Sequence, residues 1–318
     1  MRMAPSTTSL LAAIILAGCF ISSRAEGQVD PVTGFPREVS LKKEWKPRKK
    51  VAVCFLFYVE VWGFGQGPNF RPDMATRNPD LVDEAFREYA INFGVPRVAS
   101  VFKEEDEPLS IALSGLFPGQ QPEAWKKFHS ILPKAAIVAH GMNNSSAQLP
   151  MGKGLGAQTT YVKQVLDLIE KDTGVRPKGW SSPSVYNNVD TFRACAANGM
   201  QYSLDAMDTD FLSVMTTPEG KLDLIPYPPV TVDMGQYLGR NLEPEDLERL
   251  WINYVTELAR EADKNPDQPA TVVAIGIHPF VVGSPNGAAA MRRTLEALKK
   301  LPNVWITDTD ALAAAGKP

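Results

Sequence analysis

The sequence predicts an α/β fold, in the form of a single, distorted (β/α) barrel with about seven parallel strands. Apolar segments of strand length alternate with amphipathic segments along residues 51–318, and this alternation is typical of parallel strands joined by helical crossovers. No repeat of fixed period and no low-complexity linker divides this region. Ionisable residues follow four of the apolar segments, and in a parallel barrel these strand ends hold the active site.

Seven segments have the length and apolar content of buried strands. They are Val51–Val59, Val95–Phe102, Ala135–Ala139, Met200–Asp205, Leu222–Pro226, Thr271–Ile277 and Val304–Thr307. Six segments have the pattern of amphipathic helices, and these are Asp80–Phe93, Pro122–His129, Thr159–Thr173, Val189–Asn198, Pro244–Lys264 and Ala288–Lys300. Start and stop signals flank several of the helices, such as Asn78-Pro79 before the first and Gly174 after the third.

Length and composition limit the classes of function. The chain has 318 residues, of which 44% are hydrophobic, and this is enough for one large barrel with a sizeable core. The formal net charge is −3, and we find no Lys/Arg run long enough to form a basic stripe. We therefore expect no nucleic-acid partner, and a small molecule or a glycan as substrate.

The first 25 residues have the pattern of an export signal. Leu10–Ala17 is an apolar run that is too short to span a bilayer as a stable helix. Leu16-Ala17-Gly18-Cys19 resembles a bacterial lipobox, which would place a lipid on Cys19, whereas Ser23-Arg24-Ala25 fits an ordinary signal peptidase site. Both interpretations predict export, to the periplasm or to a bacterial membrane through a lipid anchor at Cys19.

Residues 26–50 are rich in Pro, Gly and charge and show no hydrophobic period. This composition predicts an N-terminal arm that leads into the barrel domain of residues 51–318.

Three ionisable residues stand directly after predicted strands. Glu60 follows the first strand, and His140 and His278 follow two later strands. Because the carboxyl ends of parallel barrel strands meet at one face, we expect these side chains to converge. A buried histidine that bonds only to backbone is the alternative for His140 and His278. His129 ends a charged helical segment, so we expect it at the surface.

Several segments, taken in their order and spacing, point to a known family. They are Tyr58-Val59-Glu60, the segment from His140 to Ser145, the segment from Gly174 to Pro183, Asp190-Thr191, the segment from Ala197 to Asp205, Ile225-Pro226-Tyr227, Asp233, His278-Pro279, Gly283-Ser284-Pro285 and Val304-Trp305. With these segments, nearly the whole mature chain resembles the polysaccharide deacetylase (NodB-homology) superfamily, and within it the allantoinase-like and cyclic-imidase-like branch. The resemblance implies a barrel hydrolase that cleaves a carbon–nitrogen bond other than a peptide bond.

The resemblance also implies a metal site, from which this sequence departs. The superfamily's metal-dependent members hold a divalent ion such as zinc with an Asp and two His spaced His-x-x-x-His. Here Asn144 stands at the second His position, and Val59-Glu60 replaces the paired Asp-Asp. Because a neutral amide oxygen is a poor zinc ligand, we expect no cofactor. A metal, if bound, would be held by Glu60, His140 and Asn144.

Without a metal, Glu60, His140 and His278 are the predicted catalytic residues. Hydrolysis of an amide needs a general base that activates water and a donor for the oxyanion or the leaving nitrogen. We expect Glu60 or His140 to be the base, and His278 to be the donor or general acid.

Further residues are candidates for substrate binding. Asn143 and Asn144 could donate hydrogen bonds to a substrate carbonyl, or stabilise their loop as Asx turns. The resemblance adds Asp210 and Asp233, which match acidic positions of the allantoinase-like branch, although a loop Asp is often a turn or cap residue.

Trp62 and Trp180 lie in or beside the loops at the ends of predicted strands. Each could stack on a sugar or a flat ring, or pack in the core. We weigh the two roles equally for both residues.

Three functions are consistent with these residues. Export favours N-deacetylation of a glycan, whereas the allantoinase-like segments favour the opening of a small cyclic amide. The alternative is a catalytically silent carbohydrate-binding lipoprotein, because Asn144 and Gly287 stand where the resemblance leads us to expect reactive side chains.

Overall fold

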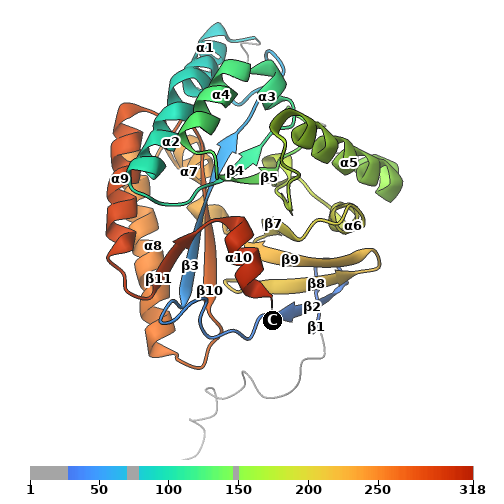
Figure 1. Cartoon of the computed structure of the whole chain (residues 1–318), viewed down its shortest axis with the longest axis vertical. Coiled ribbons are helices and arrows are strands. Elements are labelled where there is room, and N and C mark those ends of the chain that lie inside the picture. Colours follow the sequence, from blue (N-terminus) through green and yellow to red (C-terminus); the bar gives the residue numbers. More distant parts are fainter. Residues whose placement is uncertain (1–27, 70–78, 146–149, 318) are drawn as a thin grey trace, which may run out of the picture.

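The computed structural model describes residues 28–69, 79–145 and 150–317, whose strands form one 11-stranded sheet (Figure 1). Its central strand is β3 (Val51–Val59), in which all nine residues are buried. A continuous apolar run of this kind is expected where both faces of a strand are covered. Neighbouring strands in the order β10-β3-β4-β5-β6-β7-β9 pair in parallel. The predicted distorted (β/α) barrel is confirmed.

The distortion arises at β3. The other parallel strands are β4 (Ser110–Leu113), β5 (Ala136–Ala139), β6 (Gly179–Trp180), β7 (Tyr202–Ala206), β9 (Gly220–Pro226), β10 (Thr271–Ile277) and β11 (Val304–Thr307). Strand β10 pairs with residues 51–57 of β3 and so occupies one edge of that strand. Strand β11 pairs with residues 51–54 and β4 with residues 56–59, so these two strands share the other edge.

Part of the predicted N-terminal arm belongs to the sheet. Strands β1 (Gln28–Val29) and β2 (Pro36–Val39) form an antiparallel hairpin, and β2 pairs with β8 (Ser213–Thr217). The Trp45 side chain is buried, and its Nε1 donates to the carbonyl of Thr271. Residues 1–27 lie outside the described residues, so the export signal and the lipid on Cys19 stay predictions.

Helices surround the sheet, and most of them cover its outer side (Figure 1). They are α1 (Leu81–Tyr89), α2 (Val95–Glu104), α3 (Phe117–Gln120), α4 (Pro122–Ile131), α5 (Gly154–Thr173), α6 (Val189–Ala197), α7 (Asp233–Arg240), α8 (Pro244–Lys264), α9 (Pro285–Lys299) and α10 (Thr309–Gly316), with a π-helix η2 (Ala90–Gly94) and short 3₁₀ turns η3 (Met151–Lys153), η4 (Pro183–Val185) and η5 (Pro229–Thr231). Helix α9 packs against α8 and α2, and α5 packs against α6. Within the described part of the chain, no helix is both long and apolar enough to cross a membrane.

One predicted strand is wrong. The segment 95–102 forms helix α2, and the neighbouring strand of the barrel is β4. Residues 95, 96, 98, 99, 101 and 102 are buried, and this spacing places them on one face of a helix. A short apolar run does not distinguish a strand from a buried helix, and Pro96 is tolerated because it lies in the first turn.

Candidate active site

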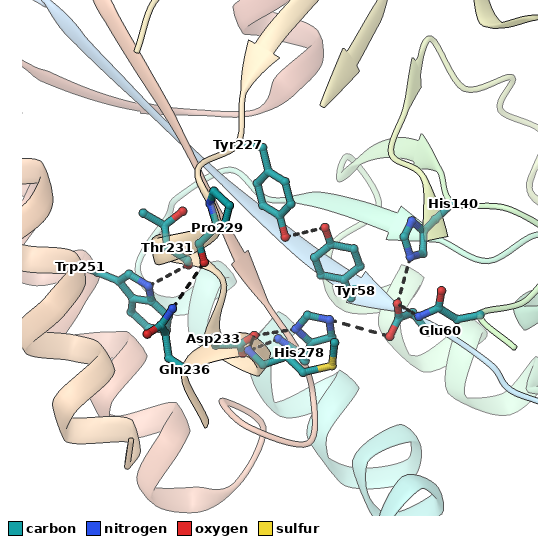
Figure 2. A network of polar contacts seen from close by, with 12 residues as sticks. Tyr58, Glu60, His140, Tyr227, Pro229, Thr231, Asp233, Gln236, Trp251 and His278 are labelled. Carbon is teal, nitrogen blue, oxygen red and sulfur yellow. Dashed lines mark hydrogen bonds and ion pairs between the residues drawn. The ribbon is translucent and has the colours of Figure 1, made fainter. Parts of the chain in front are cut away.

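The three predicted catalytic residues lie together at the carboxyl ends of barrel strands (Figure 2). Glu60 follows β3, His140 follows β5 and His278 follows β10. Only 3%, 1% and 2% of these residues, respectively, is exposed. The three side chains are therefore almost completely shielded from solvent in this structure.

Glu60 is held from one side. Its Oε1 lies 3.0 Å from Nε2 of His140 and accepts a hydrogen bond of 2.6 Å from Nδ2 of Asn144. Its Oε2 is buried and has no hydrogen-bond partner among the described residues, and the same is true of Oδ1 of Asn144. A buried carboxylate oxygen without a partner is costly. Oε2 of Glu60 therefore retains the capacity to accept a further hydrogen bond.

The hydrogen bonds of His140 determine where its protons lie. Its Nδ1 is 2.7 Å from the carbonyl oxygen of Ser181, which can only accept, so Nδ1 carries a proton. In a neutral imidazole Nε2 then has no proton. The contact between Nε2 and Oε1 of Glu60 thus requires one shared proton, carried either by the imidazolium or by the carboxylic acid.

His278 is oriented by Asp233, the first residue of α7. The imidazole Nδ1 donates to Oδ1 of Asp233 at 2.6 Å, and the His278 backbone N donates to Oδ2 at 2.6 Å. Nε2 of His278 faces Oε2 of Glu60 at 3.9 Å. This distance exceeds a hydrogen bond, but both atoms can contact one common small group between them.

The charges around His278 favour its protonated form. Burial opposes a charge on the ring, but the carboxylates of Asp233 and Glu60 outweigh burial and raise the pKa of His278. Burial also raises the pKa of Asp233, against the hydrogen bonds from His278. Because Asp233 accepts from both Nδ1 and the backbone of His278, it holds the ring in one orientation with Nε2 toward Glu60.

Two tyrosines complete the cluster, and sequence reasoning did not assign them to the site. The Tyr58 ring stacks on the His278 ring, with centroids 4.3 Å apart and planes 5° apart, and its hydroxyl donates to the Tyr227 hydroxyl at 2.6 Å. Burial raises the pKa of Tyr58. Tyr58 is the last but one residue of β3 and stands two residues before Glu60, so the alternation of an extended chain places both side chains on the same side. That spacing is the signal that could have identified Tyr58.

Trp180 belongs to a buried network beside the cluster. Its ring is fully buried, and its Nε1 donates to Oγ of Ser182 at 2.9 Å. Ser182 donates from its backbone N and its Oγ to the two carboxylate oxygens of Asp205. In this conformation the Trp180 ring packs in the core and presents no face to a substrate.

The other predicted substrate-binding residues are dispersed. Trp62 is partly buried and packs against the core in the loop after β3, and Oδ1 of Asn143 accepts from the backbone N of Ser145, as in an Asx turn. Asp210 is exposed, and its carbonyl accepts from Val272 at the start of β10. Because His278 follows the other end of that strand, the structure does not bring Asp210 to the cluster.

The side chains present do not fit a tightly bound divalent metal. Among the residues that the structure describes, no group of three His, Cys, Asp or Glu could hold an ion. Asn144 presents an N–H donor to Glu60 where a second imidazole would stand, and His140 contacts the same carboxylate oxygen directly. One imidazole, one carboxylate and one amide form a weak ligand set for zinc.

Comparison with solved structures agrees with this architecture. A probable polysaccharide deacetylase from Pseudomonas aeruginosa PAO1 superimposes with a TM-score of 0.71 and 19% identity over 86% of this chain and 93% of that chain. The chain has the polysaccharide deacetylase fold. Puue allantoinase superimposes equally well, with a TM-score of 0.71 and 22% identity over 86% of this chain and 92% of that chain. No protein-family model and no curated protein sequence matches the chain.

Proposed function

We propose that this protein is a hydrolase that cleaves a carbon–nitrogen bond other than a peptide bond, without a bound metal. The main support for this proposal is that Glu60, His140 and His278 lie together. Oε2 of Glu60 and Nε2 of His278 face each other at 3.9 Å. General acid–base hydrolysis requires two such groups within reach of the same reacting centre. The relatives in fold are named as a deacetylase and an allantoinase, and both names are consistent with this reaction class.

In the proposed reaction, Oε2 of Glu60 takes a proton from water as the water oxygen bonds to the substrate carbonyl carbon. His140 and Asn144 hold Glu60 through its other oxygen. When the tetrahedral intermediate collapses, the carbon–nitrogen bond breaks and Nε2 of His278 gives its proton to the leaving nitrogen. The proton that Glu60 took from water then passes to Nε2 of His278, so both groups recover their starting states.

Two further features support this assignment of roles. The raised pKa of His278 favours the protonated ring that a general acid needs near neutral pH. The arrangement of Asp233 and His278 resembles the carboxylate–imidazole pair of hydrolytic triads, where the carboxylate fixes the tautomer and orientation of the ring.

Substrate and location complete the proposal. N-deacetylation of a glycan and opening of a small cyclic amide are the two candidate reactions. From residues 1–25 we propose that the protein is exported, to the periplasm or to a membrane through a lipid on Cys19.

The purified protein should be incubated with N-acetylated oligosaccharides, cyclic amides and ureides, with acetate, ammonia and ring opening as readouts. We expect turnover that persists in chelator and is lost in His278→Ala. The matched control is His129→Ala, which removes an exposed histidine on α4 and should leave turnover unchanged. Turnover abolished by chelator and restored by zinc would contradict the metal-free reaction. Glycan binding with no turnover on any substrate would leave the carbohydrate-binding alternative.

A further inference from the structure

The segment that leads into β3 is strongly basic. Residues 42–50 contain one carboxylate, Glu44, and six cations, which are Lys42, Lys43, Lys46, Arg48, Lys49 and Lys50. The segment has a formal net charge of +5, whereas the whole chain has −3, so the remaining residues together carry −8. Positive charge is thus concentrated in nine residues of an acidic protein.

A tight turn brings these cations together, although other residues interrupt them in the sequence. The backbone N of Trp45 donates to the carbonyl of Lys49, and the backbone N of Lys49 donates to the carbonyl of Lys46, both at 2.8 Å. The buried Trp45 side chain holds the turn against the barrel through its hydrogen bond to the carbonyl of Thr271. The fold therefore forms a basic surface that no continuous Lys/Arg run would predict.

Three of the cations are free to meet a partner. Lys43 and Arg48 are exposed and Lys49 is half-buried, and in the described part of the chain none of these three side chains forms an ion pair. Two carboxylates lie nearby, but both are engaged. Glu44 accepts from the backbone N of Arg48, and Oδ1 of Asp263 lies 3.9 Å from Nζ of Lys50. The surface consequently keeps an excess of positive charge.

An exposed apolar side chain adjoins the basic segment. Leu41, which directly precedes Lys42, is 68% exposed. At a membrane surface, cations attract anionic headgroups, and an apolar side chain gains by entering the boundary of the acyl chains. The combination of unpaired cations with an exposed leucine therefore matches an anionic lipid surface better than a small soluble anion.

The basic surface and the catalytic cluster lie at opposite ends of the central strand. Residues 42–50 end where β3 begins, at Val51, and Glu60 follows its last residue, Val59. Nine residues of extended strand span about 30 Å. In Figure 1 the blue segment that enters β3 lies at the lower end of the barrel. A membrane that contacts this end leaves the catalytic end facing away from the bilayer.

We propose that residues 41–50 form a docking surface for an anionic phospholipid membrane, which holds the protein with its catalytic end turned away from the bilayer. The docking surface requires neither the proposed hydrolysis nor the proposed lipid on Cys19. It adds an electrostatic attraction to whichever anchor the amino-terminal residues supply.

Vesicle sedimentation tests the docking surface. Residues 26–318, which include every described element, are purified and mixed with vesicles of phosphatidylglycerol and phosphatidylcholine, or of phosphatidylcholine alone. We expect binding to the anionic vesicles only, and a loss of binding as salt is raised, because salt screens exposed charges. Each cation near an anionic surface strengthens binding roughly fivefold. The triple variant Lys43→Glu, Arg48→Glu, Lys49→Glu should therefore bind on the order of 100-fold more weakly.

The matched control reverses three other exposed lysines, Lys127 in α4, Lys153 in η3 and Lys171 in α5. It changes the net charge by the same amount, and it should keep most of the wild-type affinity for anionic vesicles. A milder variant, Lys43→Gln, Arg48→Gln, Lys49→Gln, replaces the reversal variant if that one does not fold, and it should bind at least about tenfold more weakly than the wild type.

Three results overturn the proposal. One is equal affinity of the docking-surface variants and the control for anionic vesicles. Another is wild-type binding to neutral vesicles that is as strong as binding to anionic vesicles. The third is binding to soluble polyphosphate without binding to any vesicle, which would make a soluble polyanion the partner instead of a membrane.

Discussion

Replacing Asp233 by Asn tests the pair on which the proposed acid catalysis depends. The Asp233 carboxylate accepts three hydrogen bonds of 2.6 Å, from Nδ1 and the backbone N of His278 and from the backbone N of Met234. An amide keeps the shape but has only one acceptor oxygen, so at least one buried donor loses its partner. We expect the free energy of unfolding to fall by about 2–4 kcal/mol. We expect kcat to fall on the order of 10²–10⁴-fold. The reason is that His278 loses both the hydrogen bond that orients its ring and the negative charge that stabilises its protonated form.

The loss of stability should depend on pH. Asp233 and Glu60 raise the pKa of His278 in the folded state above its ordinary value of 6.5. A raised folded-state pKa gives stability that is fully present below the unfolded pKa and is lost as pH rises through the folded pKa. Asp233→Asn removes most of this contribution, so the variant should be further below the wild type at about pH 6 than at about pH 9.

Urea unfolding at both pH values and a pH profile of kcat measure these effects. The alkaline limb of kcat should move to lower pH in the variant, because the acid form of His278 is lost earlier. Asp223→Asn is the matched control, since burial also raises the pKa of this half-buried aspartate on β9. A variant with wild-type kcat and an unmoved alkaline limb would refute the acid role of His278.

Other substitutions separate catalysis from packing. Glu60→Gln should lower kcat on the order of 10²–10⁴-fold; a loss below threefold would exclude it as the base. Gly276→Ala should lower the unfolding free energy by about 1–3 kcal/mol, because a Cβ there would lie 2.2 Å from the Tyr227 hydroxyl, whereas Gly119→Ala, with 3.7 Å of clearance, should be tolerated. Trp180→Phe should lower Tm and leave KM unchanged, and a raised KM at wild-type Tm would indicate substrate stacking instead.

Local patterns predicted the longest elements accurately. Strands β3 and β10 and helix α8 have the predicted bounds, because each is a long apolar or amphipathic run whose period is visible within the segment. The strands β4 and β6, of four and two residues, were missed. Segments this short carry too little pattern, and they become strands because the barrel pairs them with β5.

The predicted catalytic residues came from one structural rule. Ionisable side chains after apolar strands must share a face of a parallel barrel, and this rule located Glu60, His140 and His278. It did not distinguish among loops, which is why Asp210 and Asp233 were treated alike. Asp210 lies at the start of β10, whereas Asp233 bonds to the histidine after its end.

The sequence by itself determined the barrel class, the strand-end positions of the reactive groups and the departure from the usual metal ligands. These depend on residue type and on periods of a few residues, which are local properties. Tertiary structure alone decided which groups bond to one another: Asp233 and His278 are 45 residues apart, and Glu60 and Asn144 are 84 apart. Closure of the barrel brings such residues within 3 Å, and no pattern along the chain encodes that distance.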